Sequence, residues 1–177
     1  MNIVDFELIR LTKDHEFKSF DCKDKDLNEF LLNDSKNFLV DLVAVTYLLE
    51  SDNDIVAFFS LSNDRISAED FESNNKWRKF RAKSISSSKR LKSYPAVKIG
   101  RLAVSHDYKK NHIGTSILDY IKELFMDNNL TGCKFITVDA YNDSLTFYEK
   151  NGFKYLTDED NGKDTRAMYF DLLPLDS

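Results

Sequence analysis

Residues Tyr94–Asn129 read YPAVKIGRLAVSHDYKKNHIGTSILDYIKELFMDNN, and this stretch decides the fold that we expect for the chain. Its first part, Val97–Val104, is an apolar run with β-branched residues, which predicts a buried strand. Residues 105–113 are polar and basic, as in a short loop. From Gly114 onward the apolar residues recur at helical spacing, namely Ile117, Leu118, Ile121, Leu124 and Phe125. The stretch therefore predicts a strand, a basic loop and a helix in that order.

A loop that leads from a strand into a helix is suited to hold a phosphate group. The first backbone N–H groups of a helix lack intrahelical acceptors, and the helix dipole places positive charge at the same end. Lys109 and Lys110 add two charged side chains to this loop. The alternative is an ordinary solvated turn, because basic loops are common. The sequence contains neither a GxxxxGK[ST] phosphate loop nor a GxGxxG dinucleotide motif.

The composition predicts one globular α/β domain that spans residues 1–177, since 42% of the chain is hydrophobic and 31% is charged. The two cysteines, Cys22 and Cys133, have neither zinc-site nor disulfide spacing, so we expect a reducing, cytoplasmic location. The three histidines, His15, His106 and His112, show no metal-ligand spacing, and we expect no metal. The apolar runs are too short to cross a bilayer, so no membrane association is expected.

The charge of the chain is unevenly distributed. Residues 73–98 hold nine basic residues and no acidic one, a charge of +9, whereas the remainder carries −14. We interpret residues 63–96 as a basic insertion within the domain. Its interleaved aromatic residues, Trp77, Phe80 and Tyr94, favour contact with a phosphate backbone. The alternative is a solvated loop that balances an acidic body.

Hydrophobic periodicity and turn residues predict the other elements. A helix should follow Cys22, capped by Asp24 or Asp26, and Gly152 should end a later helix. Strands are expected over residues 4–11, 44–49, 55–61, 135–140, 153–156 and 167–172, and further helices around Trp77 and over 144–151, with a mobile loop at 84–88. This order predicts a mixed α/β fold, largely antiparallel at first, with one βαβ crossover.

Within residues 96–153, the segments AVKIGRLAV, YKKNHIG and ITVDAYNDSLTFYEKNGF follow one another at a specific spacing. In these segments the chain resembles the GNAT N-acetyltransferase superfamily. The segments FDCKDKDLNEFL and VTYLLESDNDIVAFFSLS are similar to a subgroup with many bacterial members, including toxins that acetylate aminoacyl-tRNA. The resemblance implies a central mixed sheet of about six to seven strands, largely antiparallel, with a splayed pair in the middle and helices on both faces.

The resemblance implies acetyl-CoA as co-substrate. The main chain of Leu102, Ala103 and Val104 would contact the pantetheine arm, and Asn142 would lie near its acetyl end. The family's Q/R-x-x-G-x-G/A loop falls on residues 109–114, whose backbone N–H groups would hold the pyrophosphate. His112 stands where that pattern has its first glycine. The implied pyrophosphate site comprises Lys109, Lys110, Asn111, His112, Ile113, Gly114 and Thr115.

Tyr148 lies in the segment FYEKNGF, where composition alone favours packing over catalysis. The resemblance instead implies that its hydroxyl protonates the departing CoA thiolate after a neutral amine attacks the thioester. A backbone N–H such as that of Val104 would stabilise the oxyanion. His106 and Asp139 are candidates for the general base, and each is equally compatible with a structural role.

We therefore expect an acetyl-CoA-dependent N-acetyltransferase that acts on a primary amine of a small molecule or an aminoacyl group. One alternative is a toxin-type enzyme that docks tRNA on residues 76–98, acetylates aminoacyl-tRNA and is bound by an antitoxin. The other is a non-catalytic acyl-CoA-binding module on the same fold, which the histidine in the loop keeps open. The resemblance also implies a homodimer.

Overall fold

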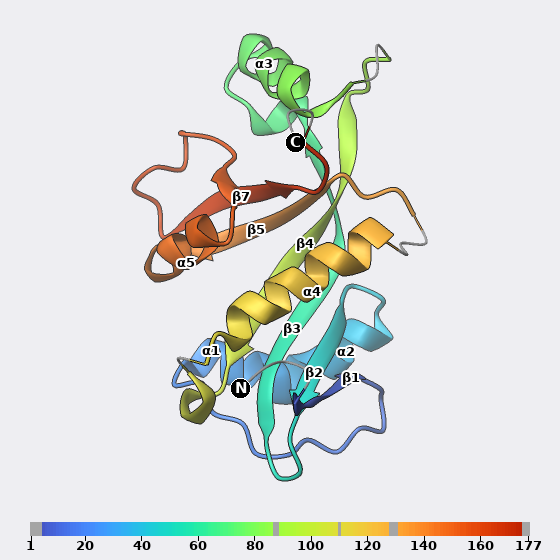
Figure 1. Ribbon diagram of the computed structural model, residues 1–177, viewed down its shortest axis with the longest axis vertical. Coiled ribbons are helices and arrows are strands. Elements are labelled where there is room, and N and C mark those ends of the chain that lie inside the picture. The colour runs from blue at the N-terminus through green and yellow to red at the C-terminus, as the bar shows by residue number, and fades with distance from the viewer. Residues whose placement is uncertain (1–4, 87–88, 110, 128–130, 175–177) are drawn as a thin grey trace. The chain divides into compact units, whose positions relative to one another are not determined.

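The computed structural model describes residues 5–86, 89–109, 111–127 and 131–174. Its contacts divide the chain into two compact units. The first unit comprises residues 1–62 and 99–121, and the second comprises residues 63–98 and 122–177. Two long strands pass through both units, namely β3 (Ile55–Ser67) and β4 (Ser93–Val104), as Figure 1 shows.

Antiparallel strands form the sheet of the first unit. Strand β1 (Glu7–Arg10) pairs with β2 (Val45–Glu50), which pairs with β3 across a tight turn. In that turn the Ser51 amide donates to the Asp54 carbonyl at 2.9 Å, and the Ser51 hydroxyl accepts from the Asp54 amide at 3.1 Å. The predicted hairpin is thus confirmed, and short polar side chains close it.

Helices cover both faces of the first unit's sheet. Three consecutive segments, α1 (Lys25–Glu29), the π-helical η2 (Phe30–Asp34) and α2 (Ser35–Val40), follow β1, and Asp24 caps α1 by accepting from Leu27 N at 3.1 Å. Neighbouring residues of a strand point to opposite faces. Phe58 packs against Phe30 at 6.1 Å between ring centroids, whereas Phe59 packs against Tyr120 of α4 (Ile113–Asp127) at 6.2 Å.

The second unit contains the parallel part of the sheet. Strand β5 (Phe135–Tyr141) is parallel to β4 and antiparallel to β7 (Thr165–Asp171), which also pairs with the two-residue β6 (Lys154–Tyr155). The hydrogen-bonded order is β1-β2-β3-β4-β5-β7-β6. A seven-stranded, largely antiparallel mixed sheet confirms the predicted fold class.

Both faces of the second unit's sheet are also covered. Helix α3 (Asn74–Ser84) places Phe80 5.3 Å from Phe135 and 5.1 Å from Tyr169. On the opposite face Phe170 packs 5.6 Å from Phe153, beside α5 (Leu145–Lys150). Gly152 follows α5 with φ +85°, and a Cβ there would lie 3.1 Å from the Phe170 ring, so glycine suits this C-terminal cap. Three short 3₁₀ turns complete the fold: η3 (Ala68–Asp70), η4 (His106–Tyr108) and η5 (Asn142–Ser144).

Element boundaries differ from the sequence-based expectation where distant side chains decide them. Strand β4 begins at Ser93 rather than Val97, because Tyr94 and Ala96 are buried in a cluster with Trp77. Strand β6 has only two residues, since its pairing with β7 ends at Tyr155. The loop expected at 84–88 begins where α3 ends, and residues 87 and 88 lie outside the described part.

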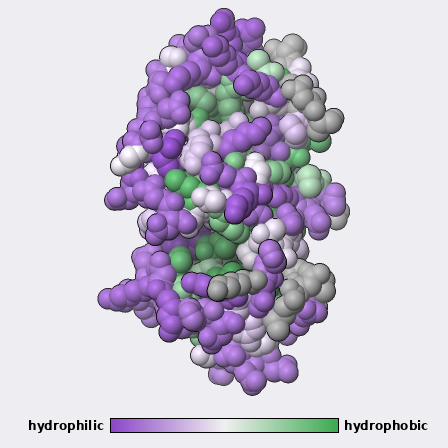
Figure 2. Space-filling model, turned by 60° about the vertical axis from the view of Figure 1, so that its left-hand side comes forward, coloured by the Kyte–Doolittle hydropathy of each residue, from purple (hydrophilic) through white to green (hydrophobic). Residues whose placement is uncertain are grey.

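The surface reflects the high content of charged residues. On the face drawn in Figure 2, hydrophilic side chains dominate and apolar ones show in small groups. Within the described ranges, no helix is both long and apolar enough to cross a membrane. In the same ranges, no group of three or more His, Cys, Asp and Glu side chains is placed to hold a metal ion.

Candidate active site

The predicted pyrophosphate loop lies in the first unit, between the end of β4 and the start of α4. The chain leaves β4 at Val104, forms η4 and enters α4 at Ile113, one residue before the expected start. The amide of Ser116 donates to the His112 carbonyl at 3.0 Å, so His112 begins the helical hydrogen bonding. The amides of Ile113, Gly114 and Thr115 therefore belong to the first turn, where helix donors lack intrahelical acceptors. This end of α4 can present backbone donors to an anion.

His112 has a backbone conformation that glycine adopts readily. Its φ is +57°, in the left-handed region. A non-glycine residue pays about 1–2 kcal/mol for that conformation, although histidine is among the residue types found there more often than most. The histidine at the first glycine position of the loop pattern thus keeps the chain path that a glycine would allow. Lys110, the second predicted lysine, lies outside the described residues.

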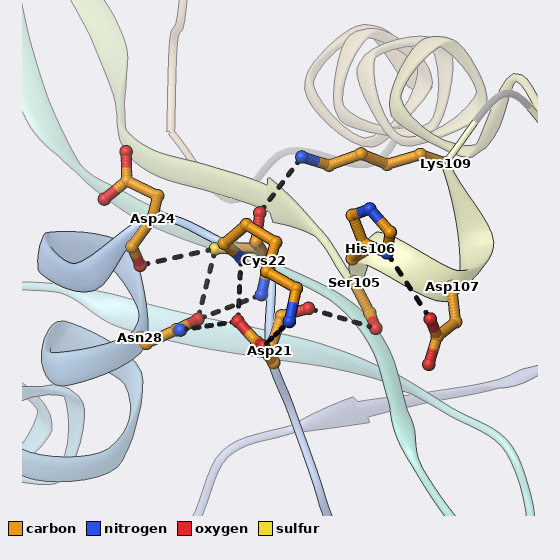
Figure 3. A network of polar contacts seen from close by, with 9 residues as sticks. Asp21, Cys22, Asp24, Asn28, Ser105, His106, Asp107 and Lys109 are labelled. Atoms are coloured by element: carbon orange, nitrogen blue, oxygen red, sulfur yellow. Dashed lines mark hydrogen bonds and ion pairs between the residues drawn. The ribbon is translucent and has the colours of Figure 1, made fainter.

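Lys109 contacts backbone in the first unit rather than standing free in the loop. Its Nζ donates to the Cys22 carbonyl at 3.0 Å (Figure 3). The loop is further attached by the His106 amide, which donates to the Asp21 carbonyl at 2.8 Å, and by the Ser105 amide, which donates to Val56 O at 2.8 Å. These contacts join the loop to residues far away in the sequence and fix its start.

Residues 21–28 form the polar network that holds this attachment, and sequence reasoning assigned it no role beyond a helix cap. The Asn28 side chain accepts from the Cys22 amide at 3.0 Å and from its thiol at 3.2 Å, and it donates to Asp21 Oδ1 at 2.9 Å (Figure 3). Hydrogen bonds from Lys23 hold the pKa of Asp21 well below its usual value. The density of short polar residues in DCKDKDLN was the one available signal.

The end of β4 agrees with a splayed strand. The β4–β5 ladder covers three residue pairs and ends at Lys98–Thr137, whereas β4 continues to Val104. Beyond that ladder, Ala103 is buried in the core cluster that contains Phe30 and Phe58, and Leu102 and Val104 are partly exposed. Residues 99–104 therefore extend past Lys98–Thr137, the last residue pair of the β4–β5 ladder.

Tyr148 lies on α5 in the second unit and is 6% exposed. Its ring packs edge-on against Phe147 at 5.1 Å and Phe153 at 5.3 Å. Burial raises the pKa of its phenol well above the ordinary value near 10. The hydroxyl is therefore protonated throughout the neutral range, which is the state that a general acid needs.

Asn142 and the two base candidates have local partners. The Asn142 side chain donates to the Lys163 carbonyl at 3.0 Å, which fastens η5 to the loop before β7. Asp139 forms an ion pair with Lys98, whose partner in the β4–β5 ladder is Thr137, two residues before Asp139. His106 is exposed, with its Nδ1 3.5 Å from Asp107 Oδ1. Asn142, Asp139 and Tyr148 belong to the second unit, and His106 belongs to the first with the loop.

Comparisons with known proteins agree with the fold described above. The sequence family described as an acetyltransferase (GNAT) domain matches residues 46–170. No curated protein matches the chain. A crystal structure of a bacterial toxin is similar with a TM-score of 0.76 and 15% identity, over 94% of this chain and 90% of that one.

Two further solved structures are similar over nearly the whole chain. AtaT complexed with acetyl-methionyl-tRNAfMet has a TM-score of 0.73 and 21% identity, over 94% of this chain and 95% of that one. AtaTR bound with acetyl-CoA has a TM-score of 0.73 and 20% identity, over 94% of each chain. At these identities the likeness shows a shared fold.

Proposed function

Since the chain belongs to the GNAT acetyltransferase family, we propose that it transfers an acetyl group from acetyl-CoA to a primary amine. The observation that carries this proposal is the start of α4, where His112 takes a left-handed backbone conformation and the first-turn amides follow it. That cradle fits a pyrophosphate, because its donors are backbone groups and do not depend on glycine as such. Acetyl-CoA supplies the acetyl group as a thioester.

We assign some residues of the chain to binding of acetyl-CoA and others to the chemical step. The amides of residues 111–115 hold the pyrophosphate, and the main chain of Leu102, Ala103 and Val104 binds the pantetheine arm. The Val104 amide stabilises the oxyanion that forms when the amine attacks. Tyr148 then donates its phenolic proton to the departing sulfur. A positioned general acid of this kind contributes about 10²- to 10⁴-fold to the rate.

A narrower function is favoured by the charge of residues 73–98, which carry +9 on an otherwise acidic chain. The acceptor would then be the amino group of an aminoacyl-tRNA, and an antitoxin would be the partner that restrains the enzyme. The described AtaT complex with acetyl-methionyl-tRNAfMet supports this choice of acceptor. Growth arrest on expression, together with acetylation of a charged tRNA by the purified protein, would support it. Acetylation of free amines with no effect on charged tRNA would leave only the broader function.

The variant Tyr148→Phe tests the general-acid role. We expect turnover of acetyl-CoA, measured as thiol release with an amine panel, to fall about 10²-fold or more. Acetyl-CoA affinity, measured by calorimetry, should stay within about threefold, because the phenol acts on the leaving group. Since the phenol's pKa is raised, wild-type turnover should not decline between pH 7 and about pH 10 through loss of its proton.

Tyr169→Phe is the matched control, because Tyr169 is a half-buried tyrosine of the same unit that packs on Phe80 and Phe135. It should leave turnover within about twofold. Full activity of Tyr148→Phe would refute the role of Tyr148. A wild-type protein that neither binds acetyl-CoA nor releases thiol with any amine would refute acetyl transfer itself.

A further inference from the structure

The C-terminal half of α3 borders a small basic cavity in the second unit. Its volume is about 140 Å³, and its lining comprises Arg78, Arg81, Ala82, Ile85, Arg90 and Tyr94. Three of these six residues carry a guanidinium group and none is acidic. We name this cavity the arginine pocket. Its location on α3 can be followed in Figure 1, where α3 is labelled.

Arg81 holds a buried donor that the protein leaves unused. Its Nε is shielded from solvent and has no hydrogen-bond partner among the described residues. The guanidinium lies 5.4 Å from the Trp77 ring, which fixes it by a cation–π contact. A buried, unpaired donor on a charged group is costly, and such groups normally have a partner. The contact with Trp77 and the burial of Nε hold the Arg81 side chain in place at the wall of the cavity.

The three arginines are not neutralised by the protein itself. Within the described ranges none of them forms an ion pair, and Arg78 contacts only the Asn75 amide oxygen, at 3.1 Å. By contrast Lys76, on the same helix, pairs with Glu72 and lies 3.9 Å from Asp158. Helix α3 thus contains a paired cation, Lys76, and two guanidinium groups, those of Arg78 and Arg81, that line the cavity.

Size and chemistry select a phosphate group as the ligand. The cavity is smaller than the roughly 300–1,000 Å³ of pockets for drug-sized ligands, so it suits one anionic group rather than a whole nucleotide. Guanidinium forks match phosphate oxygens in pairs of hydrogen bonds. Ala82 and Ile85 contribute the apolar part of the lining.

The surroundings select a polymer as the source of that phosphate. Lys79 and Lys83, both exposed on α3, add positive charge to the same helix outside the lining of the pocket. A phosphodiester backbone repeats its charge along the chain and would engage these side chains in turn. We propose that the arginine pocket binds a backbone phosphate of RNA. This inference rests on the narrower function proposed above, for which it names a binding site, and it does not depend on acetyl transfer itself.

Trp77 is the only tryptophan in the chain, so its fluorescence reports on the pocket. Its ring lies 5.8 Å from Tyr94 and beside Arg81, both of which line the cavity. Titration of the full chain with an uncharged tRNA transcript should change this fluorescence in a saturable manner. The variant Arg81→Lys keeps the charge but loses the forked donor, and we expect the affinity to fall about tenfold.

A control variant and a second variant of the pocket accompany Arg81→Lys. Lys76→Gln removes from the same helix a charge that Glu72 already neutralises and that does not line the pocket, and it should change the affinity less than about twofold. Arg90→Gln, an exposed position on another wall, should again weaken binding about fivefold or more and guards against a folding defect of the Arg81 variant. Circular dichroism melting curves should show that all three variants remain folded.

The outcomes separate the alternatives. Equal losses in Lys76→Gln and Arg81→Lys would mean that the pocket is not a particular site for RNA and would overturn the proposal, as would RNA binding with unchanged Trp77 fluorescence. Inorganic phosphate should give the same fluorescence change only at far higher concentration. A response to inorganic phosphate as strong as that to RNA would assign the pocket to free phosphate instead. Thiol release with small amines stays the separate measure of acetyl transfer, so each proposal can fail alone.

Discussion

The loop at residues 105–114 and the arginine pocket both suit a phosphate group, but they offer it different donors. In the loop the donors are backbone amides at the start of α4, and the ammonium of Lys109 is engaged by the Cys22 carbonyl at 3.0 Å. In the pocket the donors are guanidinium side chains, one of which has a buried and unpaired Nε. Phosphate binding by the loop therefore depends on the conformation of the main chain, whereas phosphate binding by the pocket depends on the identity of its side chains.

This difference explains why the two regions tolerate sequence change differently. A backbone cradle accepts any residue that can keep the dihedral angles, which is how histidine can stand at the position of the loop's first glycine. A guanidinium site loses its forked geometry when arginine is replaced, even by lysine. The loop should thus respond to changes that move the main chain, and the pocket to changes in charge and salt.

The largest expected difference between the two regions is in how their ligand affinities depend on salt concentration. If the pocket and its flanking cations neutralise about three phosphates, RNA affinity should fall about 20- to 40-fold between 50 and 200 mM salt. Acetyl-CoA affinity should change less than about threefold over the same range, because backbone dipoles rather than free cations hold the pyrophosphate. Anisotropy with labelled tRNA and calorimetry with acetyl-CoA measure the two.

A variant of each kind sharpens the salt experiment. Arg81→Gln should reduce the slope of log affinity against log salt by about 1. Lys76→Gln should leave the slope nearly unchanged, because Glu72 already neutralises that lysine. Equal salt slopes for RNA and acetyl-CoA would remove the distinction between the two regions.

The polar network under the loop predicts the next largest effect. Asn28→Ala leaves the Cys22 amide without its acceptor in a residue that is 4% exposed. We expect a loss of about 2 kcal/mol in the free energy of unfolding, measured by urea titration. Acetyl-CoA affinity should also weaken, since the Cys22 carbonyl would no longer be fixed for Lys109, while RNA affinity should stay constant.

Asn37→Ala on α2 is the control for Asn28→Ala. Asn37 is exposed, and its side chain donates to the Asn33 carbonyl, four residues earlier in the adjoining segment η2, at 3.2 Å. Its replacement should cost less than about 0.5 kcal/mol. A similar loss in both variants would show that the network around Asn28 adds no particular support to the loop.

The sequence was sufficient to predict those elements of the fold that local residue patterns determine. Apolar periodicity indicated the β2–β3 hairpin, the strand before the loop and the helix after it, and the spacing of Trp77 and Phe80 indicated α3. These elements are fixed by which face their own residues bury. The family resemblance then pointed to Tyr148 as the general acid. The motif alone could not show that its phenol is buried and has a raised pKa.

Contacts between distant residues could not be read from the sequence. Periodicity carries no information on which carbonyl Lys109 reaches, because its partner Cys22 lies 87 positions away. The sequence showed the positive charge of residues 73–98. Only the structure distinguishes Arg81, which packs against Trp77 and has a buried Nε, from Lys76, which Glu72 neutralises. Likewise the early start of β4 depends on the burial of Tyr94 beside α3.

The smallest effect concerns His112 and tests the backbone cradle directly. His112→Gly removes left-handed strain but adds freedom to the unfolded chain, two changes of about 1 kcal/mol that nearly cancel. The equilibrium constant of unfolding and the affinity for acetyl-CoA should therefore both stay within about twofold of the wild-type values. His112→Val places a β-branched residue at φ +57°, where it fits poorly, and should cost about 1–2 kcal/mol of stability and weaken acetyl-CoA binding.

His106→Val is the control for the stability measurement, because His106 is exposed and lacks a positive φ. It should change the free energy of unfolding by less than about 0.5 kcal/mol. RNA affinity should be the same in both His112 variants, since the arginine pocket does not share this backbone. If His112→Val bound acetyl-CoA as tightly as His112→Gly, the left-handed conformation would not be what the loop requires, and side-chain chemistry would have to explain acetyl-CoA binding.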